Sequence, residues 1–222
     1  MTEDPKRVLT YPEVRSAGLD DWRVLVGVLH ARFRTGNFVA GLDFAQRIGE
    51  VAEEADHHPD LDLSYPSVYL RLVSHDVGGL TSRDINLARR ISEIAAELGI
   101  ASAPETTTAL EIALDVPDAA DVRDFWAAVL DYKTTYEGRQ LEDPAGHRAA
   151  LWFQEAPSAM GEAPQRFHYD VVVPPEVVEQ RLAAAIAAGG TVVSDEAAPA
   201  FWVLADRHGN KACLCTSQGR DT

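Results

Sequence analysis

Three histidines and a carboxylate stand at the ends of predicted elements, where side chains from separate segments can meet. His57 and His58 follow a predicted helix, His75 closes a predicted strand, and Asp84 lies in the first turn of the next helix. Histidine is the side chain whose ordinary pKa is nearest neutrality. A reaction that removes one proton and delivers another needs two such groups in different environments. The pattern therefore predicts an acid/base site.

Structural explanations exist for the same residues. A histidine at a helix C-terminus interacts favourably with the helix dipole, which could account for His57 or His58 without any chemistry. Asp84 stands three residues after Thr81, at the spacing of a capping box, although Glu or Gln is the usual second member. Both explanations remain open at the level of sequence.

A metal site is the second chemical interpretation. Asp56, His57, His58 and His75 are all possible ligands. Adjacent side chains normally diverge, which argues against one ion held by both His57 and His58.

The elements that must position these residues follow from the apolar pattern of the first half. Tyr11–Ala17 predicts a short helix, and residues 22–27 and 28–34 predict two strands with Gly27 at or near their turn. Residues 65–75 alternate as a strand does. Two stripes at helical spacing predict helices on either side of that strand: Phe38, Leu42, Ala45, Ile48, Ala52 and Ala55, then Ile85, Ala88, Ile91, Ala95 and Leu98.

The run from Glu53 to Ala88 closely resembles the pterin-4a-carbinolamine dehydratase family. The family's signature is a helix ending in Glu-x-x-x-His-His-Pro, a Tyr and a strand ending in Thr-His, and then Gly-Leu-Thr/Ser-x-x-Asp. Two departures are Leu61, where the family commonly has Trp, and Ser74, where it has Thr. The resemblance covers residues 9–99, and the matching positions are Glu53, His57, His58, Pro59, Tyr65, His75, Gly79, Leu80, Thr81 and Asp84.

The resemblance implies an antiparallel sheet covered by helices and the activity of a 4a-hydroxytetrahydrobiopterin dehydratase, a hydro-lyase. Its substrate is a 4a-hydroxytetrahydropterin, which loses water to give a quinonoid dihydropterin with no metal or organic cofactor. We assign His58 and His75 to acid/base work and His57 to the same pocket. Glu53 and Asp84 would orient imidazoles or bind the pterin ring. Family members commonly self-associate, so a homo-oligomer is expected by resemblance alone.

The second half contains an internal repeat. Residues 110–130 and 167–190 each give a strand, a proline turn and a helix, with Pro117 and Pro174 separated by 57 residues. Residues 143–153 and 206–216 share the pattern Asp-x-x-Gly-x-Arg/Lys-Ala-x-Leu. Two copies of one unit are the natural interpretation, because pairing them buries the apolar sheet face that each would expose alone.

This repeat resembles the glyoxalase-like, or vicinal-oxygen-chelate, superfamily over residues 108–217. The resemblance implies two βαβββ units forming a half-open barrel around a ligand or a metal. Family ligand positions fall on Glu111, His168, Ala150 and Cys213. Because Ala150 offers no donor atom, we expect a small-molecule-binding or degenerate domain rather than a metal centre. Trp126, Trp152, Phe153 and Trp202 are interpreted as core or as lining of the barrel.

Composition narrows the functional classes. The 222 residues carry 20 basic and 35 acidic side chains, a formal charge of −15. Binding to nucleic acid or to an anionic membrane surface needs the opposite sign. The polar start, the absence of a long apolar run and only two cysteines, Cys213 and Cys215, predict a reduced cytoplasmic protein.

The expected organisation is α+β in two domains. Residues 1–101 form the dehydratase-like domain, 102–107 a linker and 108–222 the glyoxalase-like domain. A catalytic dehydratase is favoured because all three histidines are kept. The alternatives are a non-catalytic pterin or metabolite sensor, and a metal-dependent enzyme in the second domain with Glu111, His168 and Cys213 as ligands.

Overall fold

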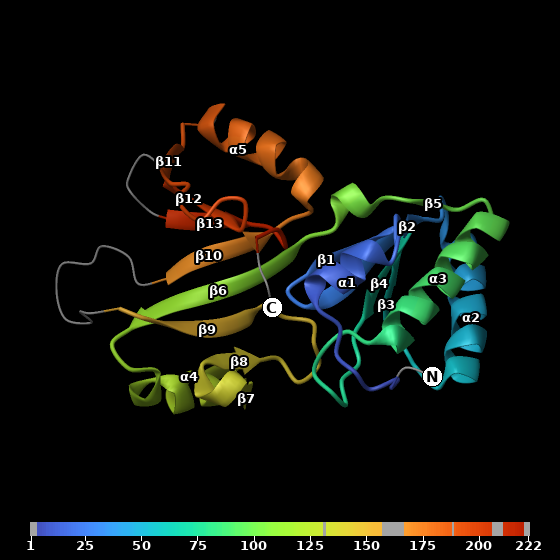
Figure 1. The fold of residues 1–222 in the computed structure, drawn as a ribbon, viewed down its shortest axis with the longest axis horizontal. Helices are drawn as coiled ribbons and strands as arrows, with labels where there is room; N and C mark the ends of the chain where they lie inside the picture. Colours follow the sequence, from blue (N-terminus) through green and yellow to red (C-terminus); the bar gives the residue numbers. More distant parts are fainter. Residues whose placement is uncertain (1–3, 131, 157–166, 188, 206–210, 220–222) are drawn as a thin grey trace. The chain divides into compact units, whose positions relative to one another are not determined.

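The chain divides into two compact units, each with a sheet of its own (Figure 1). The structure is a computed structural model that describes residues 4–130, 132–156, 167–187, 189–205 and 211–219. The first unit reaches Thr107, and the second runs from Thr108 to Gln218. Within the described residues, no helix combines the length and the apolar character needed to cross a membrane.

The first unit is an antiparallel sheet with helices. Its strands lie in the order β1-β2-β4-β3, and the short strand β5 pairs with β2. In chain order the elements are α1 (Tyr11–Ser16), β1 (Trp22–Leu25), β2 (Val28–Arg34), α2 (Phe38–Ala55), β3 (Asp60–Ser64), β4 (Ser67–Leu72), α3 (Ser82–Glu97) and β5 (Ala101–Ser102).

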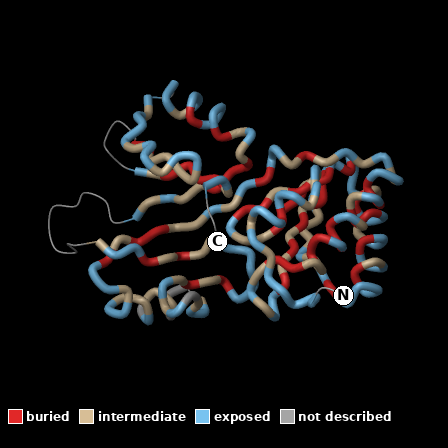
Figure 2. The backbone as a smooth tube through the Cα atoms, viewed as in Figure 1, coloured by how far each residue is buried: buried red, intermediate tan, exposed pale blue. Residues whose placement is uncertain are grey.

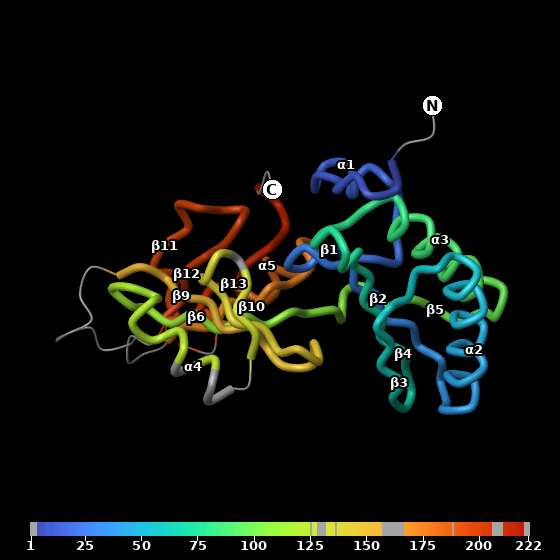
Figure 3. Tube along the Cα trace, turned by 90° about the horizontal axis from the view of Figure 1, so that it is seen from below, coloured from blue at the N-terminus to red at the C-terminus, as the bar shows by residue number. Residues whose placement is uncertain are grey.

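One apolar core joins the sheet to α2 and α3, which lie side by side against it (Figures 1 and 3). Alternate residues of β2 and β4, such as Phe33 and Leu70, point at the helices and are fully buried. Ile48 of α2 and Ile91 of α3 come from the predicted helical faces and fill the space opposite, together with Phe44, which lies outside the predicted face. Phe38 and Leu42 of the predicted α2 face are exposed instead. Buried and exposed stretches alternate along both helices (Figure 2). The two sequence periods thus produce one core, and both predicted helices are confirmed.

The hairpin between β1 and β2 turns on Val26 and Gly27, as predicted for Gly27. Both residues have positive φ, 50° at Val26 and 72° at Gly27. A two-residue turn of this kind matches the twist of the flanking strands. Glycine adopts such a φ freely, whereas a β-branched residue is strained there.

The structure differs from the sequence prediction in three places. The strand expected over residues 65–75 is shorter, β4, and His75 lies beyond it in a turn that runs from Ser74 to Gly79. Residues 60–64, for which the sequence pattern predicts no element, form β3 and pair with β4. The expected linker, residues 102–107, is also part of the first unit, since Ala103 and Thr107 are buried and Ala103 N–H donates to Arg32.

The second unit confirms the predicted repeat. Each half has a strand, a helix and three strands, and the sheet order is β11-β12-β13-β10-β6-β9-β8-β7. The first half holds β6 (Ala109–Val116), α4 (Arg123–Leu130), β7 (Lys133–Thr135), β8 (Gln140–Glu142) and β9 (Ala150–Glu155). The second holds β10 (Phe167–Val172), α5 (Val178–Ala187), β11 (Thr191–Ser194), β12 (Phe201–Ala205) and β13 (Lys211–Cys215). The start of the second copy of the Asp-x-x-Gly motif, residues 206–210, lies outside the described residues.

Each helix of the second unit covers part of one face of this sheet. Trp126 of α4 and Phe153 of β9 share one apolar cluster, and Trp202 packs with Leu182 of α5 in another. Trp152 alternates with Phe153 and contacts the ring of His168 instead. The helix-free face is therefore the polar one, and three of the four aromatics expected in the core or the lining are core residues.

Candidate active site

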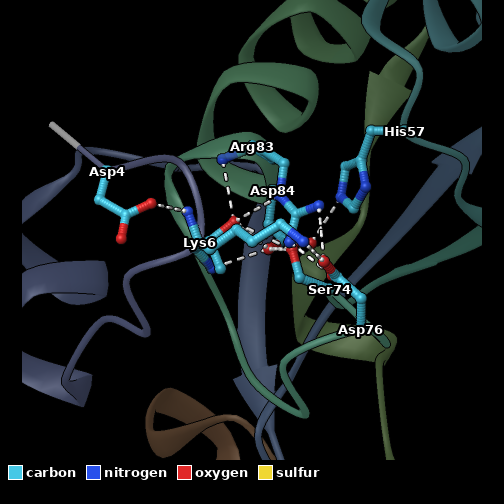
Figure 4. Close-up of polar contacts among 8 residues, drawn as sticks. Asp4, Lys6, His57, Ser74, Asp76, Arg83 and Asp84 are labelled. Carbon is cyan, nitrogen blue, oxygen red and sulfur yellow. Dashed lines mark hydrogen bonds and ion pairs between the residues drawn. The ribbon is translucent and has the colours of Figure 1, made fainter. Parts of the chain in front are cut away.

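The candidate site of the first unit lies where three segments meet: the end of α2, the turn after β4 and the start of α3. Figure 4 shows His57, Ser74 and Asp84, one from each segment, pointing toward one another. Helix α2 ends at Asp56, which adopts a left-handed conformation with φ 46° and lets the chain leave toward His57. Helix α3 begins at Thr81, the predicted N-cap.

Asp84 is the centre of this cluster and is fully buried. Its Oδ1 lies 2.8 Å from Nε2 of His57. Its Oδ2 accepts hydrogen bonds from Ser74 Oγ and from the Thr81 backbone N–H, both at 2.7 Å. The Thr81 hydroxyl lies 3.2 Å from the same oxygen. The predicted capping box is thus present, which confirms the structural interpretation, and Asp84 additionally contacts a histidine.

The hydrogen bond to Asp84 fixes which nitrogen of His57 carries a proton. An ionised carboxylate only accepts, so His57 donates its Nε2–H and a neutral ring keeps Nδ1 as the basic atom. His57 is itself buried, 8 % exposed, which holds the ring in one orientation. The arrangement resembles the carboxylate–imidazole pairs that prepare histidines for proton transfer.

The other two histidines are exposed. His58 Nε2 lies 3.1 Å from Glu53 Oε1, and 54 % of the His58 side chain is accessible. His75 is exposed in the turn directly after Ser74, the residue that donates to Asp84. The structure therefore links the segments of all three predicted histidines through His57, Ser74 and Asp84, and it pairs Glu53 with His58.

Sequence reasoning missed a network of charges that holds the His75 turn. Asp76 accepts from Arg83 Nη2 at 2.6 Å and lies 3.2 Å from Lys6 Nζ (Figure 4). These hydrogen bonds, that of Arg83 foremost, lower the pKa of Asp76 to about 2. Asp76 directly follows His75 in the sequence, and this position next to a predicted site residue is the signal that could have pointed to it. The turn is thus tied both to α3 and to the N-terminal segment.

The sequence comparison decides the family of this unit. The family model described as pterin 4 alpha carbinolamine dehydratase matches residues 8–94. A protein of Mycolicibacterium smegmatis is 36% identical over 92 residues, which is 40% of this chain and 98% of that protein. A protein of Mycobacterium tuberculosis is 42% identical over 86 residues, 38% of this chain and 92% of that protein. Both are named pterin-4-alpha-carbinolamine dehydratase, with the activity marked as unproven.

The chain belongs to the pterin-4a-carbinolamine dehydratase family.

A solved structure is also similar to this dehydratase-family unit. It is a transcriptional coactivator/pterin dehydratase from Brucella melitensis, 30% identical, which covers 40% of this chain and 99% of that chain with a TM-score of 0.39.

The polar face of the second unit holds the residues that sequence analysis proposed as ligands. Glu111 of β6 pairs with Asp170 of β10, which in turn pairs with Cys213 of β13. His168 stands two residues before Asp170 and therefore on the same face. Ala150 of β9 pairs with Glu111 and brings no donor.

Asp170 is the residue that sequence reasoning missed on this face. Ligand atoms of His168, Asp170 and Cys213 all lie within 4.8 Å of one another, whereas the predicted Glu111 is outside this group. Burial and then the Asp170 carboxylate raise the pKa of the Cys213 thiol to about 12. The signal that could have found Asp170 is its spacing of two from His168 on a strand.

The second unit of this dehydratase-family chain is a glyoxalase-like domain. The family model of that description matches residues 111–215. A solved structure from Vibrio splendidus 12B01, a member of the glyoxalase/bleomycin resistance protein/dioxygenase superfamily, is 14% identical with a TM-score of 0.34. It covers 50% of this chain and 100% of that chain.

Proposed function

We propose that the first unit dehydrates a 4a-hydroxytetrahydropterin to the quinonoid dihydropterin, as a 4a-hydroxytetrahydrobiopterin dehydratase. The observation that carries the proposal is the buried contact between His57 and Asp84, 2.8 Å long, in a network that joins the segments bearing His58 and His75. The family to which the chain belongs supports the same substrate class.

The reaction is a loss of water across N5 and C4a of the pterin. A base takes the N5 proton while an acid protonates the hydroxyl at C4a, whose carbon–oxygen bond breaks to release water. The electron pair of the N5–H bond forms the new double bond between N5 and C4a. The pterin is neither oxidised nor reduced overall, so two proton-transfer groups suffice and no cofactor is required.

The exposed histidines are the proton-transfer groups in this proposal. His58 and His75 are open to a ligand, and each such group typically contributes about 10²–10⁴-fold to rate. His57 belongs to the same pocket, where Asp84 holds its Nε2–H and leaves Nδ1 available. Glu53 orients His58 through their contact of 3.1 Å.

The turn that bears His75 has supports on two sides. Arg83 and Lys6 bind Asp76, and Ser74 donates to Asp84. A histidine that must meet a substrate atom benefits from such supports, because small misplacements slow a positioned proton transfer. The second unit, in this proposal, binds a small molecule on its polar face.

A stopped-flow measurement tests the proposal with the full chain. Freshly formed 4a-hydroxytetrahydropterin is mixed with the protein, and the quinonoid product is followed by absorbance. We expect dehydration well above the rate in buffer and proportional to protein concentration. A protein that binds a tetrahydropterin in calorimetry but leaves the buffer rate unchanged would be a sensor, and that result rejects the enzymatic proposal.

A further inference from the structure

Three chemically different donors meet on the polar face of the second unit, far in sequence from the histidines of the first. The imidazole of His168, the carboxylate of Asp170 and the thiol of Cys213 have ligand atoms within 4.8 Å of one another. They come from the adjacent strands β10 and β13, so backbone hydrogen bonds fix their spacing. All three are at least largely buried, with 14 % of the His168 and Asp170 side chains accessible.

The orientation of His168 is that of a ligand with a supporting carboxylate. Its Nε2 faces Asp170 Oδ1 at 3.5 Å, and its Nδ1 faces Asp115 Oδ1 at 3.7 Å. The Trp152 ring packs edge-on against the imidazole, with the ring centroids 5.9 Å apart. Imidazoles that bind metals through one nitrogen commonly direct the other toward a carboxylate in this way.

The distance between His168 and Asp170 fits two donors that share an ion better than two donors that bind each other, whereas the Cys213 thiol hydrogen-bonds to Asp170. A separation of 3.5 Å is too long for a strong hydrogen bond between His168 and Asp170. Two ligands about 2.0–2.1 Å from a tetrahedral ion stand roughly 3.3 Å apart. The Asp115 Oδ1 atom is buried and has no hydrogen-bond partner within the described structure, although it points toward His168. A more positive imidazole, as metal binding produces, would give that oxygen a stronger partner.

We propose that His168, Asp170 and Cys213 bind a divalent transition metal, with zinc the best match, and that Asp115 orients His168 in support. Nitrogen, oxygen and sulfur donors in one group suit Zn²⁺. Three protein ligands leave a fourth position for water or a ligand oxygen. On binding, the Cys213 thiol releases its proton to solvent and coordinates as thiolate.

This site departs from the ligand set that the sequence predicted. Ala150 removes one family position and Glu111 lies outside the group, so the symmetric arrangement of two ligands from each half is lost. Asp170 takes the place of Glu111 from the neighbouring strand, with which it pairs. The three donors therefore all come from the second half of the repeat. This proposal replaces the expectation that the second domain holds no metal.

Cobalt titration of the full chain tests the site. The protein carries no affinity tag, is stripped with a chelator and is titrated with Co²⁺ while absorbance is recorded. We expect saturation at one equivalent, with visible bands of four-coordinate cobalt and a near-ultraviolet band from thiolate-to-cobalt charge transfer. Addition of Zn²⁺ should bleach both. Absence of saturable binding at one equivalent overturns the proposal.

Matched variants identify the ligands. Cys213→Ser should abolish the charge-transfer band, whereas Cys215→Ser, a buried cysteine two residues along the same strand, should keep it. Asp170→Asn and His168→Gln should each weaken Co²⁺ binding by at least about tenfold, and Asp115→Asn by about 10–100-fold. A band that survives Cys213→Ser, or unchanged affinity in Asp170→Asn and His168→Gln, contradicts the site.

The near-isosteric Asp170→Asn variant keeps the test decisive if Cys213→Ser fails to fold, with near-ultraviolet circular dichroism as the folding check. The proposed dehydration uses none of these residues. A variant that loses metal binding but keeps its dehydration rate is therefore folded, and its loss of binding belongs to this site.

Discussion

Asp84 acts as a pure acceptor, since every neighbour that contacts it supplies a proton. His57, Ser74 and Thr81 together direct donors at both of its oxygens in a fully buried position. Such a carboxylate cannot be exchanged for an amide of the same shape. Whichever way an asparagine turns, its NH₂ group faces a donor.

Asp84→Asn is therefore expected to slow dehydration by about 10²–10⁴-fold, because His57 must then change tautomer or lose its partner. The unpaired donors should also lower the free energy of unfolding by about 1–3 kcal/mol. Stopped-flow rates across a pH series check the first effect, and a changed pH profile separates it from simple loss of folded protein. The exposed Asp43→Asn is the matched control; equal rates in the two variants would contradict this role for Asp84.

His30 is a buried histidine outside the candidate site. It lies on the sheet face opposite the helices and is 6 % exposed, with Nδ1 2.5 Å from the Tyr69 hydroxyl. Burial, helped by the charge of Arg71, lowers the pKa of His30 to about 4, against the Leu25 backbone hydrogen bond that raises it. The ring is thus neutral at pH 7 and accepts the Tyr69 proton.

The stability of the first unit should consequently fall as the pH drops from about 6.5 to about 4. Within this window the unfolded chain protonates His30 and the folded chain does not, so unfolding takes up a proton. The loss amounts to at most about 3 kcal/mol. His30→Gln can keep both hydrogen bonds without titrating, and it should remove this part of the slope. Hydrogen exchange of the β2 amides measures the stability of the first unit at each pH. The same pH dependence in the wild type and in His30→Gln would refute this role for His30.

At the residue scale, the sequence predicted which side chains belong to the candidate site but not which of them contact one another. His57, His58, His75 and Asp84 could be chosen by type and position. That Asp84 binds His57 across 27 residues depends on where α2 ends and α3 begins, which only packing decides. Asp170 was missed for the same reason, because its pairing with Cys213 is set by the register between two strands.

The β1–β2 hairpin is the element with visible local strain. Val26 has φ 50°, a conformation that a β-branched residue adopts at a cost, and its side chain is exposed. Val26→Asn places Asn-Gly at a turn that requires positive φ, and we expect a gain of about 1 kcal/mol in stability. Val26→Ala, which keeps the unfavourable φ, is the control. Calorimetry of the full chain should show a higher transition temperature for Val26→Asn, and no difference between the two variants would disprove the strain.

Periodicity predicted the long elements and missed the short ones. The stripes that predicted α2 and α3 span four or five turns, which fixed the existence of both helices. On α2 the buried face includes Phe44 and leaves Phe38 and Leu42 exposed, so the predicted face was partly wrong. Strand β3 has only Leu61 and Leu63 as its alternating apolar pair, and β5 has two residues. Both form because β4 and β2 offer edges to pair with, and such edges exist only after the sheet has assembled.

The two proposals concern different units of the molecule. Residues 1–101 hold 11 basic and 16 acidic side chains, and residues 102–222 hold 9 and 19, so the second part carries most of the charge. Among the residues that the structure describes, the apolar clusters also fall into separate units, with one in the first unit and two in the second. Because the proposed dehydration site and the proposed metal site share no residue, each can be removed by substitution while the other is measured.

The most direct test of the dehydratase account is the dehydration rate of full-length histidine variants. His58→Ala and His75→Ala should each lower the rate by at least about 100-fold. His147→Ala, an exposed histidine of the second unit, should leave it unchanged. A folded His58→Ala/His75→Ala double variant that turns over carbinolamine at nearly the wild-type rate would contradict the account.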